Sequence, residues 1–278
     1  MQVHDPATLE LLRRGTLEVA GRIVEASNAT LLCTIELDGV SAHCVYKPVR
    51  GERPLWDFPD GTLAGREVAS YLLAQATGWG VIPPTVLRSG PFGDGMVQLW
   101  IDSAAASISE SGTAEYVEQV SDLVELCAPG EVPSGWKEIL RAQDYGGDVV
   151  VLAHADSAQL RRMAVLDLVL NNADRKGGHV LAGLDGGVYG VDHGICLHTE
   201  NKLRTVLWGW AGESIGDEAT EVLSRLAAEL QGHLGEALHE HLTIREVDAV
   251  SRRLRRVLAH REMPAPSGTR PTIPWPAF

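Results

Sequence analysis

The stretch that decides the fold is MAVLDLVLNNADRKGGHVLAGLDGGVYGVDHG, residues 163–194. Its first eight residues form an apolar run that predicts the end of a buried helix. A polar loop follows, in which two amides, an Asp-Arg pair, a lysine and two glycines precede His179. HVLAGLDGGVYGVD then predicts two short strands joined by a turn at Asp185-Gly186.

A hairpin folded about that turn places His179 opposite Asp192, with the two backbones about 5 Å apart. Asp174 lies just ahead on the loop, so two carboxylates and an imidazole converge at one end of a small structure. One carboxylate without an obvious partner can act as a base, and the other two groups can hold a cation. The alternative is a polar turn at a helix end, whose Asp and Asn side chains cap backbone groups. Because Asp192 lies opposite His179 in the predicted hairpin, we favour a functional site over a polar turn that only caps a helix.

Length and composition limit the class of protein. The chain has 278 residues and 45% hydrophobic content, enough for one large domain or two lobes that share an interface. It has no run of eighteen apolar residues and no apolar core of signal-peptide type, so we expect no transmembrane segment and a cytoplasmic location. Its four cysteines are scattered without a CxxC pair, which indicates reduced thiols.

The charge is strongly acidic and unevenly spread. The formal net charge is −13, and residues 104–160 carry ten Asp and Glu against two Lys and Arg. This balance argues against nucleic acid as a partner and against a general attraction to anionic lipid.

The pattern changes along the chain from strands to helices. Strands are predicted at 17–25, 30–37, 41–49, 81–90 and 95–101, with a hairpin turn at Asp38-Gly39 and a helix at 62–77. Helices are predicted at 114–126, 134–143, 157–170 and 242–260, before a proline-rich tail from about 264. The last helix is opened by Thr243, with Glu246 at the distance of a capping box. This predicts an α+β protein of two lobes, residues 1–101 and 102–278.

The motifs resemble a known family. DRKGGH at 174–179 followed by VDHG at 191–194 resembles the catalytic loop and metal-binding motif of the phosphatidylinositol 3-/4-kinase-like superfamily, which includes HipA-type kinases. There an N-x-D-R/D-H-x-x-N loop precedes a D-F-G-like triplet. Nearly the whole chain resembles a small actinobacterial-type family of this superfamily. The resemblance implies a bilobal protein-kinase-like fold, with a strand-rich N-terminal lobe and a mostly helical C-terminal lobe.

The resemblance also implies roles for single residues. Asp174 matches the aspartate that accepts or orients the proton of the attacking hydroxyl, and Asp192 matches the aspartate that binds Mg²⁺. His179 stands where the family has a cation-binding asparagine. A neutral imidazole can also bind a divalent metal but is the softer ligand, so the expected cofactor is Mg²⁺ or Mn²⁺. Lys176 replaces a common histidine, and it either stands near the γ-phosphate or points to solvent.

The N-terminal half contains a matching nucleotide site. Phosphoryl transfer requires a cation on the phosphates of ATP and a carboxylate that holds this cation. Lys47, near the end of a predicted strand, and Glu67, in the first turns of the next helix, fit these roles. The hairpin register places Lys47 beside Thr30, next to a turn in which Ser27, Asn28 and backbone N–H groups would bind phosphate.

GMVQLWI, residues 95–101, falls between the predicted lobes. The family binds adenine there through backbone hydrogen bonds, so the resemblance implies this role for Gln98, Leu99 and Trp100. The alternative for Leu99 is a buried strand position.

The leading hypothesis is an ATP-dependent kinase that transfers the γ-phosphate to a hydroxyl of an unknown protein or small molecule. A lipid acceptor is less well supported, because the segment after Asp192 offers only Lys202 and Arg204 as cations before the tryptophans.

Two further classes of function stay open. The first is a nucleotide-binding pseudokinase with a regulatory role, in which His179 marks decayed catalysis. The second is a metal-dependent hydrolase that would use Asp174, His179, Asp192 and His193. The hydrolase would leave the Lys47 and Glu67 pair without a role.

Overall fold

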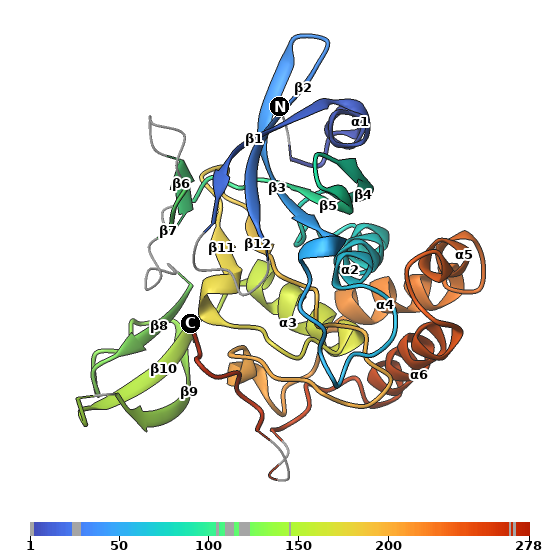
Figure 1. Cartoon of the computed structure of the whole chain (residues 1–278). Coiled ribbons are helices and arrows are strands. Elements are labelled where there is room, and N and C mark those ends of the chain that lie inside the picture. Colours follow the sequence, from blue (N-terminus) through green and yellow to red (C-terminus); the bar gives the residue numbers. More distant parts are fainter. Residues whose placement is uncertain are drawn as a thin grey trace.

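The structure is a computed structural model that describes residues 3–23, 29–103, 106–108, 114–116, 123–144, 146–266, 268 and 271–278. Antiparallel sheets and helices share the chain, which confirms the predicted α+β class (Figure 1). The N-terminal sheet occupies the top of that view and most of the helices lie below it. Within the described ranges, no helix has the length and apolarity of a membrane span.

The N-terminal sheet has five antiparallel strands in the order β1-β2-β3-β5-β4. The strands are β1 Thr16–Arg22, β2 Leu31–Leu37, β3 Val40–Pro48, β4 Thr85–Gly90 and β5 Gly93–Leu99. Asp38 and Gly39 join β2 to β3 with φ angles of 51° and 79°, the left-handed values that such a hairpin turn requires. Because Leu31 pairs with Tyr46, the following Lys47 lies level with Thr30, as the sequence predicts.

One face of this sheet is covered by α1 (Pro6–Arg14), a helix that the sequence analysis does not anticipate. Asp5 caps it by accepting a hydrogen bond from the Ala7 N–H, and proline suits the first helical position. Leu11 and Leu12 are buried in the core on this face.

The other face of the sheet is covered by α2 (Leu63–Thr77). The Thr62 side chain caps its start, and Gly78 ends it in the left-handed conformation, at the position the sequence predicts. Val68 of α2 packs against Met96 of β5, and the same face of the helix carries Glu67 toward the sheet. Glu67 of α2 thereby reaches Lys47 of β3.

A second sheet contains β8 (Val124–Cys127), β9 (Trp136–Gln143) and β10 (Val149–Ala155), in the order β8-β10-β9. It projects to one side of the molecule in Figure 1. The predicted helix at 134–143 is wrong, because WKEILRAQ forms β9. Its residues favour a helix locally, but pairing with the β-branched strand β10 overrides this preference.

The predicted helix at 114–126 is wrong as well. Its first residues form β7 (Ala114–Tyr116), which pairs with β6 (Ala106–Ile108), and its last residues belong to β8. Residues 117–122 lie outside the described part of the chain. Both errors have one cause, since each segment forms a strand by pairing with another strand, and this pairing overrides its local preference for a helix.

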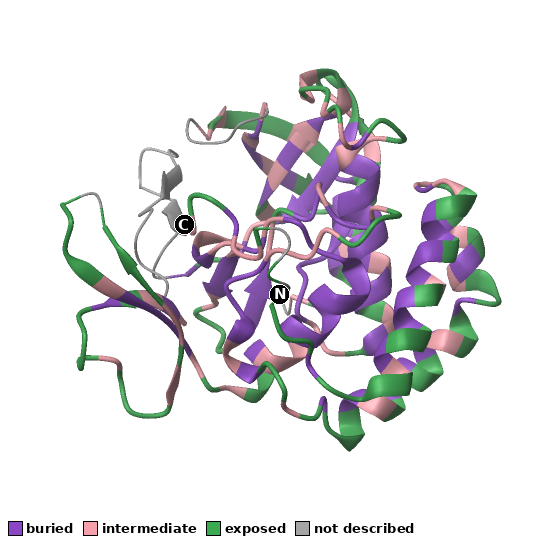
Figure 2. Ribbon diagram, turned by 90° about the horizontal axis from the view of Figure 1, so that it is seen from below, coloured by how far each residue is buried: buried purple, intermediate pink, exposed green. Residues whose placement is uncertain are grey.

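The helical part contains α3 (Ala158–Leu170), α4 (Asp217–Glu229), α5 (His233–His239) and α6 (Ile244–His260). From Met163 to its end α3 is buried throughout, which explains its continuous apolar run. Thr243 and Glu246 open α6 with reciprocal hydrogen bonds, so the capping box predicted there is confirmed. Figure 2 shows buried residues gathered through the middle of the molecule and exposed ones on the outer helices and the projecting sheet.

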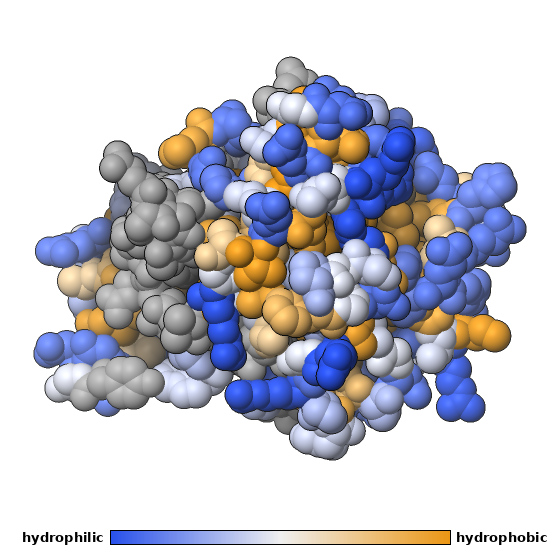
Figure 3. All heavy atoms as spheres, turned by 45° about the horizontal axis from the view of Figure 1, so that its top comes forward, coloured by the Kyte–Doolittle hydropathy of each residue, from blue (hydrophilic) through white to orange (hydrophobic). Residues whose placement is uncertain are grey.

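The surface has no broad apolar face in the view of Figure 3, where hydrophobic side chains appear in small groups between hydrophilic ones. Trp56 is the most exposed large apolar residue of the described chain at 92%. Scattered exposed residues of this kind are common on soluble domains. All four cysteines are buried free thiols, which confirms that they are not paired in disulfides.

Candidate functional site

The hairpin that follows the polar loop consists of β11 (Val180–Ala182) and β12 (Val188–Gly190). Its register differs by one residue from the predicted one, because Val180 pairs with Gly190 and His179 therefore lies level with Val191. The cause is a three-residue turn closed by a hydrogen bond from the Gly183 N–H to the Gly187 carbonyl, with Gly186 at a φ of 83°.

His179 and Asp192 nevertheless meet. The chain leaves β12 through Asp192, whose φ of 59° is unusual for a residue other than glycine and turns its carboxylate back toward the loop. The distance from His179 Nε2 to Asp192 Oδ2 is 3.5 Å. The predicted proximity is therefore confirmed, although the pairing that was expected to cause it is wrong.

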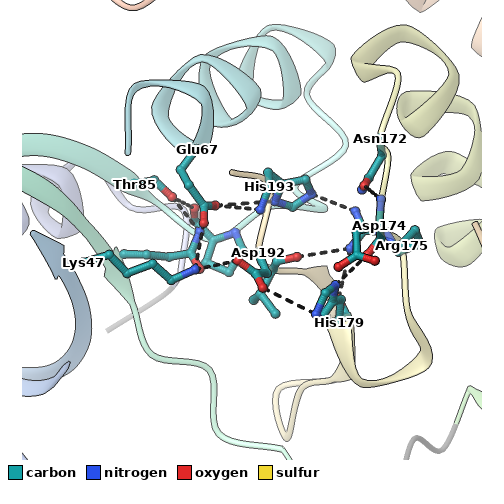
Figure 4. A network of polar contacts seen from close by, with 12 residues as sticks. Lys47, Glu67, Thr85, Asn172, Asp174, Arg175, His179, Asp192 and His193 are labelled. Carbon is teal, nitrogen blue, oxygen red and sulfur yellow. Dashed lines mark hydrogen bonds and ion pairs between the residues drawn. The ribbon is translucent and has the colours of Figure 1, made fainter. Parts of the chain in front are cut away.

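Lys47 is the central cation of the site. Its ammonium lies 2.8 Å from Glu67 Oε1 and 2.7 Å from Asp192 Oδ1, so it connects β3 and α2 with the segment after β12 (Figure 4). The second oxygen of Glu67 accepts a hydrogen bond of 2.8 Å from the His193 N–H. Both oxygens of the buried Glu67 are thus bound, and Glu67 holds Lys47 in one place.

The two partners of Lys47 differ in exposure. The Glu67 side chain is 2% exposed, whereas the Asp192 side chain is 51% exposed and faces open space. The Lys47 ammonium lowers the pKa of Asp192 well below its ordinary range despite the opposing effect of desolvation. Burial alone would lower the pKa of Lys47, but Asp192 and Glu67 outweigh it and raise that pKa. Lys47 and Asp192 are therefore charged at neutral pH, whereas burial raises the pKa of Glu67 and the Lys47 ammonium opposes that rise.

Asp174 lies on the loop across from this cation. Its N–H donates to Asn172 Oδ1 at 2.9 Å, and its carboxylate is 3.6 Å from the Lys176 ammonium. Burial raises the pKa of Asp174 to about 6, and the nearby Asp192 adds to this effect while Lys176 opposes it. Lys176 is 21% exposed and its ammonium is turned toward the Asp174 carboxylate and not simply to solvent, while its place near a γ-phosphate stays a prediction.

His179 is held in one tautomer. Its Nδ1 lies 2.8 Å from the Asp174 carbonyl oxygen, which can only accept, so Nδ1 carries the proton and Nε2 has a free lone pair. Burial lowers the pKa of His179 to about 4, so the ring is neutral at neutral pH. A lone pair and the Asp192 carboxylate then face each other across 3.5 Å, an arrangement that suits a cation between them.

His179 and Asp192 are two protein ligands for such a cation, and the described residues offer no third one beside them. In the ranges that the structure describes, no group of three or more His, Cys, Asp or Glu side chains is arranged to hold a metal ion. Mg²⁺ usually takes one or two carboxylates and completes its coordination with water and substrate phosphates. The pair His179 and Asp192 fits an ion of that kind better than a closed structural metal site.

A buried network beneath the loop was not predicted. Arg175 donates to both oxygens of Asp167 at 2.9 and 3.0 Å, and Asn172 donates to Asp167 Oδ1 at 3.0 Å. Arg175 also donates to His193 Nε2 at 2.7 Å. The signal in the sequence is Asp167 itself, a lone carboxylate in an apolar run, which requires a buried partner.

His193 is fully buried. Its Nε2 is occupied by Arg175, and its Nδ1 lies 4.0 Å from Glu67 Oε2. Burial lowers the pKa of His193 well below its ordinary value. His193 is therefore a neutral, buried residue, and its ring nitrogens lie near Arg175 and Glu67.

The C-terminal residues support the loop from below. The Gly177 N–H donates to the Ala277 carbonyl at 2.8 Å, and the Phe278 ring lies where a side chain at Gly177 would be. The Trp208 indole N–H donates to the Thr272 carbonyl at 2.9 Å. The described part of the proline-rich tail is thus docked against the protein next to the loop.

The expected adenine contacts are not available as predicted. The N–H groups of Leu99 and Trp100 donate to the carbonyls of Pro84 and His43 at 2.9 and 3.0 Å. Gln98 is buried, and its amide donates to Thr85 Oγ1 at 2.8 Å. The sheet thus uses the two N–H groups that were expected to bind a base. Ser27 and Asn28, the predicted phosphate-binding residues, lie outside the described residues.

Comparison with known proteins gives one result about descent. The sequence matches no protein-family model. It is 53% identical over 268 residues to Protein Rv2133c of Mycobacterium tuberculosis, in an alignment that covers 96% of this chain and 94% of that protein. Identity at this level over nearly the full length of both chains means that the chain belongs to the same family as Protein Rv2133c.

Proposed function

We propose that this protein is an ATP-dependent phosphotransferase with a bilobal, protein-kinase-like fold. The observation that carries the proposal is the Lys47 ammonium, held by the buried Glu67 on one side and reaching Asp192 on the other. A cation fixed by a carboxylate in this way is what the phosphates of ATP require. In this proposal residues 1–101 supply the nucleotide-binding lobe and residues 102–278 supply the lobe with the catalytic loop.

Asp174 is the proposed catalytic base. A carboxylate with a pKa of about 6 is ionised at neutral pH, and it is a stronger base than an ordinary aspartate. As the acceptor oxygen bonds to the γ-phosphorus, the bond from that phosphorus to the β-γ bridging oxygen breaks, and Asp174 takes the hydroxyl proton. Lys176, 3.6 Å from Asp174, is placed to stabilise negative charge on the transferred group.

His179 and Asp192 would hold the divalent cation. Such an ion supplies charge neutralisation on the phosphates during transfer. Asp192 contributes a fully ionised carboxylate, since Lys47 lowers its pKa. His179 contributes the Nε2 lone pair, which the hydrogen bond at Nδ1 directs toward Asp192. An imidazole ligand favours Mn²⁺ over Mg²⁺ more than an amide ligand would.

The position of His193 supports the proposal over a metal-dependent hydrolase. A hydrolase site of four ligands would need His193 beside Asp192 and His179. Instead His193 is buried with Nε2 bound to Arg175. The hydrolase also leaves the Lys47 centre unused, so the phosphotransferase accounts for more of the charged residues.

The test is transfer of the γ-phosphate from labelled ATP to protein or small hydroxyl compounds, with Mg²⁺ and then with Mn²⁺. We expect transfer by the wild-type protein and none by Asp174→Asn, with nucleotide binding retained in that variant. If the wild type binds ATP but neither transfers the phosphate to an acceptor nor hydrolyses ATP, the result would support the pseudokinase instead. Absence of ATP binding, measured by calorimetry with either metal, would contradict both.

A further inference from the structure

A basic pocket lies between α6 and the segment that continues from Asp192. Its volume is about 240 Å³, several times that of one water molecule. It is lined by Thr199, Asn201, Ala249, Arg252, Arg253 and Arg256. Three arginines around one small pocket stand out in a chain with a net charge of −13. None of the lining residues belongs to the Lys47 centre.

Arg253 is the residue that needs explanation. It is 7% exposed, and it donates from Nε to the Val169 carbonyl at 2.9 Å and from Nη1 to the His198 carbonyl at 2.8 Å. Its buried Nη2 has no hydrogen-bond partner. Across the described residues no carboxylate lies within 4.0 Å of this guanidinium. A buried charge with no carboxylate in direct contact is costly, and an anion in the pocket would supply one.

The two exposed arginines strengthen this conclusion. Arg252 and Arg256 are four residues apart on α6 and therefore lie on the same side of the helix. Neither forms an ion pair with a carboxylate in the described ranges, whereas Arg14 and Arg225 each pair with a glutamate four residues earlier in their helices. Burial, together with repulsion from Arg256 and Arg252, lowers the pKa of Arg253 to about 10.

We propose that this pocket binds the phosphate group of a phosphorylated small molecule. A phosphate monoester carries close to two negative charges and several acceptor oxygens, which match three guanidinium groups better than a single carboxylate does. The Thr199 hydroxyl and the Asn201 amide supply further donors at the rim. This binding does not depend on phosphoryl transfer at Lys47, because the two places share no residue.

Because of where the pocket lies, a bound phosphate would affect the stability of the fold. Arg253 holds the carbonyls at the end of α3 and at His198, so it connects the helix before the catalytic loop with the segment after Asp192. A phosphate that neutralises Arg253 from the pocket side stabilises this connection. Ligand binding therefore raises the thermal stability of the whole protein by mass action.

The experiment measures binding of inorganic phosphate by calorimetry and by thermal unfolding, at constant ionic strength with chloride as the reference anion. The test variant is Arg252→Gln/Arg256→Gln, which keeps the buried Arg253 and so spares the fold. The control is Arg245→Gln/Arg255→Gln, which removes the same charge from exposed positions of α6 outside the pocket. The Lys47→Met background removes phosphate binding at the proposed nucleotide site.

We expect the test variant to weaken phosphate binding at least about tenfold, because it removes two charge-assisted contacts. The control variant and the Lys47→Met protein should retain the wild-type affinity at the pocket. Equal weakening in test and control would show a general charge effect and overturn the pocket, as would unchanged affinity in the test variant. If Lys47→Met loses ATP binding but still binds phosphate, the pocket is separate from the proposed nucleotide site. Either proposal can then fail without the other.

A second arm distinguishes the source of the phosphate group. Vesicles of phosphatidylcholine with a minor fraction of phosphatidic acid present the same monoester at a membrane surface. Binding of free phosphate but not of these vesicles assigns the pocket to soluble ligands. Vesicle binding that the test variant loses and the control retains assigns the phosphate to a lipid headgroup. If wild-type protein binds neither probe, the proposal is wrong.

Discussion

The two sides of the loop from Asn171 to His179 differ in how their charges are satisfied. On the inner side, Arg175 and Asp167 are each 1% exposed and form a bidentate pair. On the outer side, Asp174 and Lys176 are 25% and 21% exposed and are 3.6 Å apart. The inner pair leaves little charge uncompensated and holds the loop in place. The outer residues keep charge available for a ligand.

Two buried arginines, Arg175 and Arg253, differ in the same way. Arg175 has a carboxylate, a histidine and backbone carbonyls as partners. Arg253 has two carbonyls and one unpartnered nitrogen. The satisfied Arg175 serves the fold, whereas the unpartnered nitrogen of Arg253, beside a pocket and without a carboxylate in contact, supports the binding site proposed there. Arg175 and Arg253 are therefore both buried, but the first holds the fold together and the second is proposed to bind a ligand.

The largest effect should come from the inner side of the loop. Asp167→Ala leaves the Arg175 guanidinium and the Asn172 amide without their shared acceptor. We expect the free energy of unfolding to fall by about 3–5 kcal/mol, the cost of breaking a buried ion pair by removing one partner. Chemical denaturation measures this, and Asp174→Ala in the same loop should change it by no more than about 1 kcal/mol. Similar losses in both variants would remove the distinction between the two sides.

On the outer side, Asp174 and Asp192 should separate by the step that they affect. Asp174→Asn should lower turnover by roughly 10²-fold or more and leave nucleotide affinity nearly unchanged, because it removes a base. Asp192→Ala should abolish metal-dependent nucleotide binding, because it removes a ligand for the cation. Calorimetry and initial rates distinguish the two outcomes. The assignment fails if both variants lose binding to the same extent.

A smaller effect concerns stability against pH. Burial raises the pKa of Asp174 from 3.8 to about 6, so the folded protein binds this proton more tightly than the unfolded chain does. The free energy of unfolding should therefore fall as pH rises through that window, by about 1–2 kcal/mol after allowance for partial exposure. Asp174→Asn should lack this decline and be more stable than wild type above pH about 6. A constant difference between the two proteins from pH about 4 to about 7 would show that Asp174 titrates normally.

The smallest effect should come from His179. Replacing its imidazole by the amide in His179→Asn should lower the preference for Mn²⁺ over Mg²⁺ in nucleotide binding by a few-fold, because nitrogen suits the softer ion. Burial lowers the pKa of His179 to about 4, so protonation does not explain any change near neutral pH. Titrations with each metal at one pH measure the ratio. An unchanged ratio would place His179 outside the metal shell.

Much of the site could be predicted because its determinants are local or nearly so. Lys47 follows from a two-residue turn and strict alternation, and the observed register is the predicted one. Glu67 follows from a helix whose start and end residues are typical of caps. His179 and Asp192 are close because one short hairpin brings them together. The one-residue error in that hairpin arose from turn length, which two adjacent glycines do not specify.

The set of charged residues and the short-range geometry that gathers them therefore follow from the sequence. Turns, caps and apolar runs act over a few residues, and their physics can be read from neighbouring positions. The tertiary structure alone decided that WKEILRAQ is a strand, because its partner β10 lies beyond a turn and overrides local preference. It also decided the pKa of Asp174 and the missing partner of Arg253. Both depend on burial by segments far apart in the chain, and burial sets the cost of a charge.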